Sequence, residues 1–176
     1  MLIGPQQTSP MSYEDFLDAA RPFLTEDENQ SLLATRLEPS VNAPEGLVAR
    51  FSQWEMSLRN DLVRLRAAQA GLVGSSMLRD GEPVLGTLEI AQEAMAATSP
   101  LEAELILDKE RWKFIDELQT PHHFNMEFLR GYSLKLQILE RHAHFQEDVG
   151  FAAYRDLYAR VLGAAGTAVP MGGMNG

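Results

Sequence analysis

The sequence contains no cysteine among its 176 residues. A disulfide framework, a thiolate metal site and a cysteine nucleophile are therefore all excluded. The absence of cysteine fits a protein that works in a reducing compartment, and we expect a cytoplasmic location.

Basic residues are few relative to acidic ones. The 15 lysines and arginines stand against 25 aspartates and glutamates, which gives a formal charge of −10. A surface of this sign repels phosphate backbones and anionic lipid headgroups. Nucleic acid is for this reason not an expected partner.

Long apolar runs are also missing, and none approaches the roughly 18 residues that a membrane-spanning helix needs. The first five residues, Met1–Pro5, lack the basic start and the apolar centre of a secretory signal peptide. We therefore expect a chain that is not exported by that route and has no membrane span of its own. Apolar residues still make up 45% of the sequence, which is enough to build one well-packed core.

Motifs of the common catalytic and nucleotide-binding sites are absent. The sequence has no Gly-x-Ser-x-Gly, no Gly-x-x-x-x-Gly-Lys and no Gly-x-Gly-x-x-Gly. Acidic pairs such as Glu102/Glu104 and Asp116/Glu117 could act as acid–base couples, but they lie at helix starts or on faces typical of a solvated surface. We expect a protein that is not an enzyme and needs no cofactor.

Helical patterns run through most of the chain. Residues typical of helix N-caps precede four of the apolar patterns: Ser12, Thr25, Ser99 and Asn125. The signal at Ser99 is the clearest, because Pro100 follows at the first helical position and Glu102 completes a capping box.

Seven helices are predicted from these starts and from the spacing of apolar residues: 12–22, 25–37, 45–72, 84–97, 99–118, 125–149 and 151–162. No stretch shows sustained period-two alternation, so no sheet is expected. The predicted fold class is all-α, a bundle of about seven helices that could form two pseudo-repeats. Residues 1–11 are predicted to be an extended lead-in, residues 12–162 a single helical domain, and residues 163–176 a flexible tail.

Two of the predicted helices carry the strongest core signal. The helix over 45–72 has an apolar stripe that steps by threes and fours: Leu47, Phe51, Trp54, Leu58, Leu62, Leu65 and Leu72. The helix over 125–149 is apolar most of the way round, which predicts that it is the most buried helix.

The four histidines raise the question of a metal site. Glu140 and His144 share a helix face and could form half of a zinc site, but His142 projects about 160° away from His144. The alternative is that His122 and His123 act in a turn and that the face of Glu140 is an ordinary polar stripe. That stripe consists of Ser133, Gln137, Glu140, His144 and Glu147. We favour the alternative and expect no bound metal.

Arginines gather on the second half of the helix over 45–72, at Arg59, Arg64 and Arg66. One interpretation is local: cations favour a helix C-terminus, and Arg59 can pair with Glu55 four residues earlier. The other is a protein-docking surface, since arginine and tryptophan are typical interface anchors and Trp54 lies in the same helix. On this second interpretation the partner-binding residues are Arg59, Arg64 and Trp54.

The segment Trp54–Ala67 resembles the helical signature of the C-type (or d-type) central-stalk family of V/A-type ATPases. In that signature an asparagine is followed six residues later by an arginine and a small residue, as Asn60 is here by Arg66 and Ala67. Residues 99–145 are similar to a group of uncharacterised bacterial proteins that are encoded among V-type ATP synthase subunits and resemble divergent relatives of the same central-stalk family. The similarity lies in Ser99–Glu102, Arg111-Trp112, Phe114, Asp116–Leu118, Phe124, Tyr132 and Leu134–Arg141.

The resemblance implies a helical funnel without chemistry of its own, seated on the membrane rotor ring with the central shaft docked in it. Such a protein is cytoplasmic, peripheral to the membrane through its partners, and serves ion transport by coupling the two parts of the ATPase. It implies contact roles for Arg59 and Arg64. The residues to which it assigns structural roles are Asn60, Arg66, Trp112, Tyr132 and Lys135.

Two other functions remain open at this stage. A generic helical adaptor or regulator, unrelated to ATPases, could bind a protein through the same arginine-rich helix. A metal-dependent enzyme could use the histidines.

Overall fold

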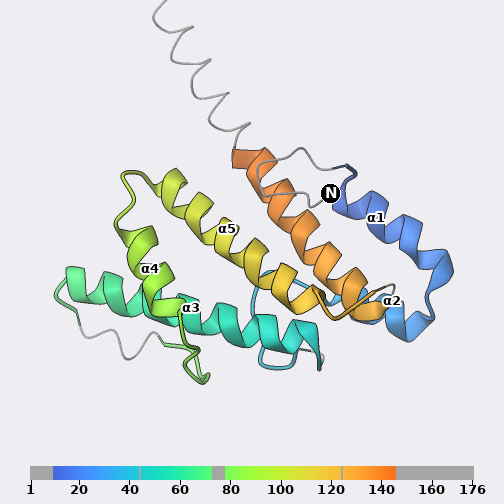
Figure 1. The fold of residues 1–176 in the computed structure, drawn as a ribbon, viewed down its shortest axis with the longest axis horizontal. Helices are drawn as coiled ribbons and strands as arrows, with labels where there is room; N and C mark the ends of the chain where they lie inside the picture. Colours follow the sequence, from blue (N-terminus) through green and yellow to red (C-terminus); the bar gives the residue numbers. More distant parts are fainter. Residues whose placement is uncertain (1–9, 44, 73–77, 124, 146–176) are drawn as a thin grey trace, which may run out of the picture. The chain divides into compact units, whose positions relative to one another are not determined.

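The computed structural model describes residues 10–43, 45–72, 78–123 and 125–145. Every regular element in these ranges is a helix, which confirms the all-α prediction (Figure 1). The chain divides into two compact units, Met1–Glu140 and Arg141–Gly176. The predicted helix over 151–162, the tail from 163 and most of the lead-in fall outside the described residues.

The elements follow one another in the order of the predicted helices. They are α1 (Tyr13–Ala20), the 3₁₀ turn η1 (Arg21–Phe23), α2 (Glu26–Leu33), α3 (Leu47–Gln69), α4 (Thr87–Met95) and α5 (Pro100–Gln119). A further helix over residues 126–145, orange in Figure 1, is called the 126–145 helix below.

The predicted N-caps form as expected. The side chains of Ser12, Thr25 and Asn125 each accept a hydrogen bond from the backbone N–H three residues further on. Ser99 does the same for Glu102 at 3.1 Å, but the capping box around it differs from the prediction. The Glu102 carboxylate returns to Thr98, whose N–H and hydroxyl donate to it at 2.8 and 2.6 Å.

The apolar spacing predicts two helices that are longer than those in the structure. α2 ends at Leu33, so Leu37 lies in the following segment. α3 ends at Gln69, and Leu72 is 63% exposed rather than part of the core stripe. Gly71, at φ +67°, ends α3 in a Schellman motif, in which the Leu72 N–H donates to the Ala67 carbonyl at 2.8 Å.

α4 is shorter than predicted because its start is fixed by contacts with α3. The Val84 N–H donates to the Ser57 hydroxyl at 2.9 Å, and Gly86 then turns the chain at φ +92°. The helix begins at the fully buried Thr87, whose hydroxyl donates to the Asp61 carboxylate at 2.7 Å.

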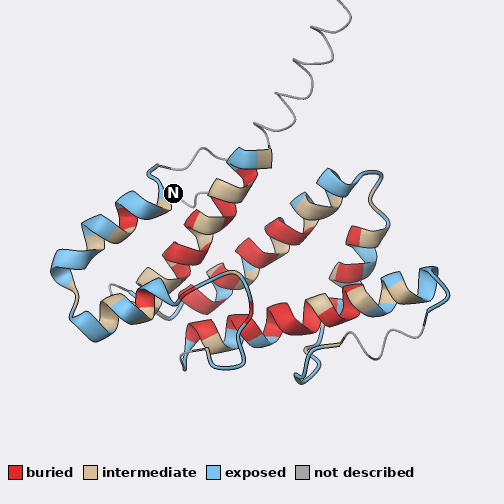
Figure 2. Ribbon diagram, turned by 180° about the vertical axis from the view of Figure 1, so that it is seen from behind, coloured by how far each residue is buried: buried red, intermediate tan, exposed pale blue. Residues whose placement is uncertain are grey.

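Burial follows the predicted stripes in α3 and the 126–145 helix (Figure 2). Phe51 and Leu58 of α3 are completely buried, as are Leu134 and Ile138 of the 126–145 helix. The side chain of Ile115 from α5 completes this core and is likewise inaccessible to solvent. Each such side chain contributes about 1.5–3 kcal/mol to folding by leaving water.

The N-terminus of α3 is capped from a distant part of the chain. Gly46, which precedes the helix at φ +92°, has no side chain to offer. Glu127 supplies the cap: its Oε2 accepts a hydrogen bond from the Leu47 N–H at 2.6 Å. A Cβ on Gly46 would lie 2.8 Å from that carboxylate, so glycine provides both the backbone angle and the space.

Two residues of the predicted polar stripe, Gln137 and Glu140, bind backbone groups distant in the sequence, whereas His144 is exposed and Glu147 lies outside the described residues. Gln137 donates to the Thr35 carbonyl at 3.0 Å and accepts from the Leu37 N–H at 3.2 Å. Glu140 accepts a hydrogen bond from the Tyr13 N–H at 2.6 Å, at the start of α1. These two side chains therefore satisfy backbone groups at the start of α1 and in the segment after α2.

Candidate functional site

Buried charges connect α3 to α5. The Glu55 side chain is inaccessible to solvent, and its two oxygens accept hydrogen bonds from Nε and Nη2 of Arg111 at 2.8 and 2.9 Å. The Nη1 atom of Arg111 donates to the equally buried Asp108 at 2.8 Å. Such bidentate, charge-assisted contacts are strong and directional, so they fix how the two helices align.

The same network reaches the surface through Arg59. Its Nε donates to Glu55 at 2.8 Å, as the four-residue spacing predicts, and its Nη1 lies 2.8 Å from Glu38. Glu38 also pairs with Arg79 at 2.9 Å. Partial burial acts to raise the pKa of the Glu38 carboxyl, but the hydrogen bonds and charges of Arg79 and Arg59 outweigh it and lower that pKa.

The three predicted partner-binding residues lie in different environments. Trp54 is 5% exposed and stacks on Phe114 with ring centroids 4.7 Å apart, so it belongs to the core and not to the surface. Arg59 is 30% exposed and occupied by its two carboxylates. The Arg64 side chain is 48% exposed and pairs with Asp61 at 2.8 Å, which leaves much of its guanidinium accessible to a partner.

Asn60 and Arg66, which carry the family-like pattern, also differ from each other. The buried Asn60 accepts from the Arg79 N–H at 2.9 Å and donates to the Arg79 carbonyl at 2.8 Å, so it holds the segment at Arg79 against α3. Arg66 is exposed and makes no ion pair or side-chain hydrogen bond with any residue in the described ranges. The structure therefore presents Arg66 to solvent instead of using it to tie helices together.

The other family-like residues meet around a pocket. The Lys135 ammonium forms an ion pair with Asp116 and lies 5.3 Å from the centre of the Trp112 ring. Tyr132 packs against Phe16 of α1 with ring centroids 5.1 Å apart. These contacts bring α5, the 126–145 helix and α1 to one place.

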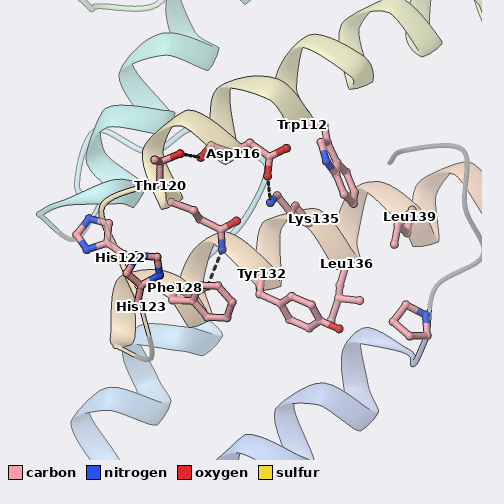
Figure 3. A pocket seen from close by; sticks show the side chains of 12 residues that line it. Trp112, Asp116, Thr120, His122, His123, Phe128, Tyr132, Lys135, Leu136 and Leu139 are labelled. Carbon is pink, nitrogen blue, oxygen red and sulfur yellow. Dashed lines mark hydrogen bonds and ion pairs between the residues drawn. The ribbon is translucent and has the colours of Figure 1, made fainter. Parts of the chain in front are cut away.

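The pocket itself has a volume of about 390 Å³ and lies between the second half of α5, the turn after it and the 126–145 helix. Figure 3 shows Trp112 and Leu139 at one end and His122 and His123 at the other. Lys135 extends from the 126–145 helix toward Asp116 between these ends. The pocket thus joins apolar walls to a small number of polar groups, the usual composition of a binding site.

A close helix approach forms one wall of the pocket. A Cβ on Gly131 would overlap the Gln119 side chain, so glycine lets α5 and the 126–145 helix come together. Gln119 is 8% exposed, and its Nε2 donates to the Phe128 carbonyl at 2.8 Å. Sequence patterns did not indicate this pocket, because its walls come from residues that alternate between core and surface positions on two helices.

The histidines occupy the polar end of the pocket and the second unit. His122 lies 3.1 Å from the Asn125 amide nitrogen through its Nδ1, as a turn residue would, and His123 is exposed. In the second unit His142 is buried and His144 is exposed. Across the part of the chain that the structure describes, no three histidine or acidic side chains are grouped so that they could hold a metal ion.

The comparisons with known proteins give no relative. No family model matches the chain, and neither the curated proteins nor the solved structures include a significant match. Within the described ranges, no helix combines the length and the apolar character needed to cross a bilayer.

Proposed function

We propose that the chain is a non-catalytic component of a V/A-type rotary ATPase, a C-type or d-type central-stalk piece that couples the central shaft to the membrane rotor ring. The proposal is carried by one observation. The two separate segments that resemble this family pack against each other and are joined by a buried ion pair.

The first of these segments, Trp54–Ala67, lies in α3, and the second, residues 99–145, contains all of α5. Glu55 of the first segment is held by Arg111 of the second through two hydrogen bonds. Trp54 of the first stacks on Phe114 of the second. The residues behind the resemblance therefore belong to one packed unit, which supports a shared fold more strongly than two independent helical patterns would.

A coupling piece has to transmit torque without deforming. Helices joined only by apolar contacts can slide past one another, whereas a buried ion pair penalises any alignment that separates its charges. The contacts of Arg111 with Glu55 and Asp108 impose such a penalty between α3 and α5 and within α5. This arrangement suits a rigid connector.

Docking requires a specific exposed surface, and the end of α3 offers one. Arg64 and Arg66 present guanidinium groups on a molecule whose formal charge is −10. Arginine is a frequent anchor of protein interfaces, and local charge of the opposite sign to the rest of a surface favours an acidic partner. We therefore place the contact with another subunit at this end of α3.

Co-purification from the native host tests the proposal. A tagged wild-type chain is expected to recover shaft and ring subunits of the ATPase under gentle conditions. Recovery should fall at least tenfold for Arg66→Glu, because a misplaced charge at an interface costs several kcal/mol. Arg50→Glu is the matched control, since Arg50 is also exposed on α3 and has no ion pair in the described ranges.

The outcome against the proposal is equally specific. If the wild-type chain recovers no ATPase subunit, the rotary ATPase assignment fails and a generic helical adaptor takes its place. If Arg66→Glu and Arg50→Glu reduce recovery equally, the contact is not at the end of α3.

A further inference from the structure

Three polar groups in the pocket have hydrogen-bonding capacity that no residue in the described ranges uses. The Oε1 atom of Gln119 accepts no hydrogen bond from any described residue, although this residue is only 8% exposed. The indole N–H of Trp112 likewise has no acceptor among the described residues. Lys135 has three N–H groups, and a single ion pair, to Asp116, is formed within these ranges.

These three groups include both hydrogen-bond donors and a hydrogen-bond acceptor. Trp112 and Lys135 are donors that call for an acceptor such as a carbonyl oxygen, and Gln119 offers an acceptor that calls for an N–H. Apolar walls lie beside them, formed by Leu136 and Leu139, which are 1% and 4% exposed. A ligand that satisfies the whole pocket has an apolar body and carries a donor and an acceptor close together.

We propose that this pocket binds an extended segment of a partner protein, with a backbone amide between Gln119 and Lys135 and an aliphatic or aromatic side chain against Leu136 and Leu139. A peptide unit carries one N–H and one carbonyl, the pair that the pocket calls for. This inference rests on the proposed function only for the identity of the partner, another component of the same ATPase.

Other ligand chemistries fit less well. A purely apolar ligand would remove water from the Gln119 oxygen and the Trp112 N–H without replacing the lost hydrogen bonds, which is unfavourable. An anionic amphiphile would gain from Lys135 but would be repelled by Asp116, which already holds that ammonium. A neutral amide avoids both penalties.

Nuclear magnetic resonance offers a direct test, because the chain has two tryptophans and hence two indole N–H signals. Trp112 lines the pocket, whereas Trp54 is stacked on Phe114 and does not line it, so its signal is an internal control. The probe is N-acetyl-leucinamide, which combines one aliphatic side chain with peptide units. Octanoate and ethylbenzene are the anionic and apolar comparison probes.

N-acetyl-leucinamide is expected to shift the Trp112 signal in a saturable way and to leave the Trp54 signal unchanged. No shift at Trp112 would overturn the proposal. So would an equal or larger affinity for octanoate or ethylbenzene, which would identify the pocket as a site for amphiphiles or for apolar molecules.

Two variants test whether the shift of the Trp112 signal comes from binding in the pocket. Leu139→Phe places a larger side chain into the cavity and should weaken probe binding at least tenfold, while Leu105→Phe makes the same exchange at an exposed position of α5 outside it. Gln119→Met keeps the length of the side chain but removes the acceptor together with the Nε2 donor to the Phe128 carbonyl, and a loss of about fivefold to tenfold is expected. An unchanged Trp54 signal verifies the fold of each variant, and wild-type affinity in both pocket variants would contradict the proposal.

Co-purification with Leu139→Phe separates this inference from the proposed function. We expect the variant to lose ATPase subunits that the wild type and Leu105→Phe retain. If Leu139→Phe retains them fully, the pocket is not the partner site, and the proposed function stands. If the wild type recovers no ATPase subunit but the amide probe still binds at Trp112, the proposed function fails and the peptide site stands.

Discussion

At the scale of single residues, sequence spacing predicts contacts within a helix and misses those between helices. The pair of Arg59 with Glu55 is predicted correctly, because four residues bring two side chains to the same helix face. Trp54 belongs to the predicted apolar stripe, but its stacking on Phe114 is not predicted, because Phe114 is distant in the sequence. The pair of Arg111 with Glu55 is not predicted for the same reason, because Glu55 lies in another helix.

Loss of Arg111 is expected to be strongly destabilising. Arg111→Met leaves the buried Glu55 with one of its two arginines and leaves Asp108 without the contact it makes at 2.8 Å. Removing one partner of a buried ion pair typically costs about 3–5 kcal/mol in the free energy of unfolding. Urea unfolding of the variant measures this cost.

A matched control and a double variant test whether the loss of stability comes from the buried ion pair. Lys113→Met makes the same kind of exchange at a side chain that is 65% exposed, and should change stability by no more than about 0.5 kcal/mol. Adding Glu55→Met to Arg111→Met removes the buried carboxylate that has lost one of its two arginines, so the double variant should be more stable than Arg111→Met alone. If Arg111→Met is as mild as Lys113→Met, the network does not hold the helices.

At the scale of elements, the starts of helices were predictable and their ends and remote caps were not. A cap such as Ser12 or Thr25 is decided by residues three apart, which the sequence displays directly. The end of α3 depends on the left-handed Gly71, after which the apolar spacing continues without a helix. The cap of α3 comes from Glu127, and no local pattern connects these two parts of the chain.

Glu127→Gln is expected to weaken the capping of α3. The glutamine keeps an acceptor for the Leu47 N–H but loses the negative charge that favours a helix N-terminus and the ion pair with Arg130. The expected loss is about 0.5–2 kcal/mol in the free energy of unfolding, measured with urea. Glu117→Gln, at an exposed position of α5, is the control, and an equal effect of both would rule out the cap.

Helix capping also predicts how stability depends on acid. Hydrogen bonds from the backbone and hydroxyl of Thr25 lower the pKa of Glu28, and the hydroxyl and backbone N–H of Thr98 lower the pKa of Glu102. A carboxyl with a lowered pKa stabilises the fold above its ordinary value of about 4.5, and this stabilisation is lost as the pH falls through the lowered value.

The melting temperature should therefore decrease as the pH falls from about 5 toward 3. The decrease should be smaller in a Glu28→Gln/Glu102→Gln variant, because neither glutamine can be protonated in this range. Glu14→Gln, exposed in the first turn of α1, should leave the acid slope closer to that of the wild type. A double variant with the wild-type slope would show that the two caps do not contribute to it.

At the scale of the whole molecule, the helical patterns predicted the fold class, but neither they nor the composition indicated which charged side chains remain exposed. Arg59 and Arg111 are 30% and 5% exposed and are bound to carboxylates of the protein itself, so they do not form a basic surface for a partner. Arg64 and Arg66 remain accessible at the end of α3. Arg59 and Trp54, two of the three residues that the sequence suggested for docking, are used inside the fold. The docking surface that we propose on this helix therefore consists of Arg64 and Arg66.

The first unit is expected to unfold as one cooperative body, because its buried apolar residues form a single cluster from Phe16 in α1 to Leu139 in the 126–145 helix. Its two tryptophans report on different parts of this cluster. Trp54 stacks on Phe114 between α3 and α5, whereas Trp112 lies beside Lys135 of the 126–145 helix.

Single-tryptophan variants test this expectation. Trp112→Phe leaves the fluorescence of Trp54, and Trp54→Phe leaves that of Trp112. Within each variant, urea transitions followed by fluorescence and by far-ultraviolet circular dichroism should coincide, as two-state unfolding requires. If the Trp112 transition preceded the loss of helix while the Trp54 transition did not, the 126–145 helix would separate first from α3 and α5, and a rigid connector could not be built on this fold.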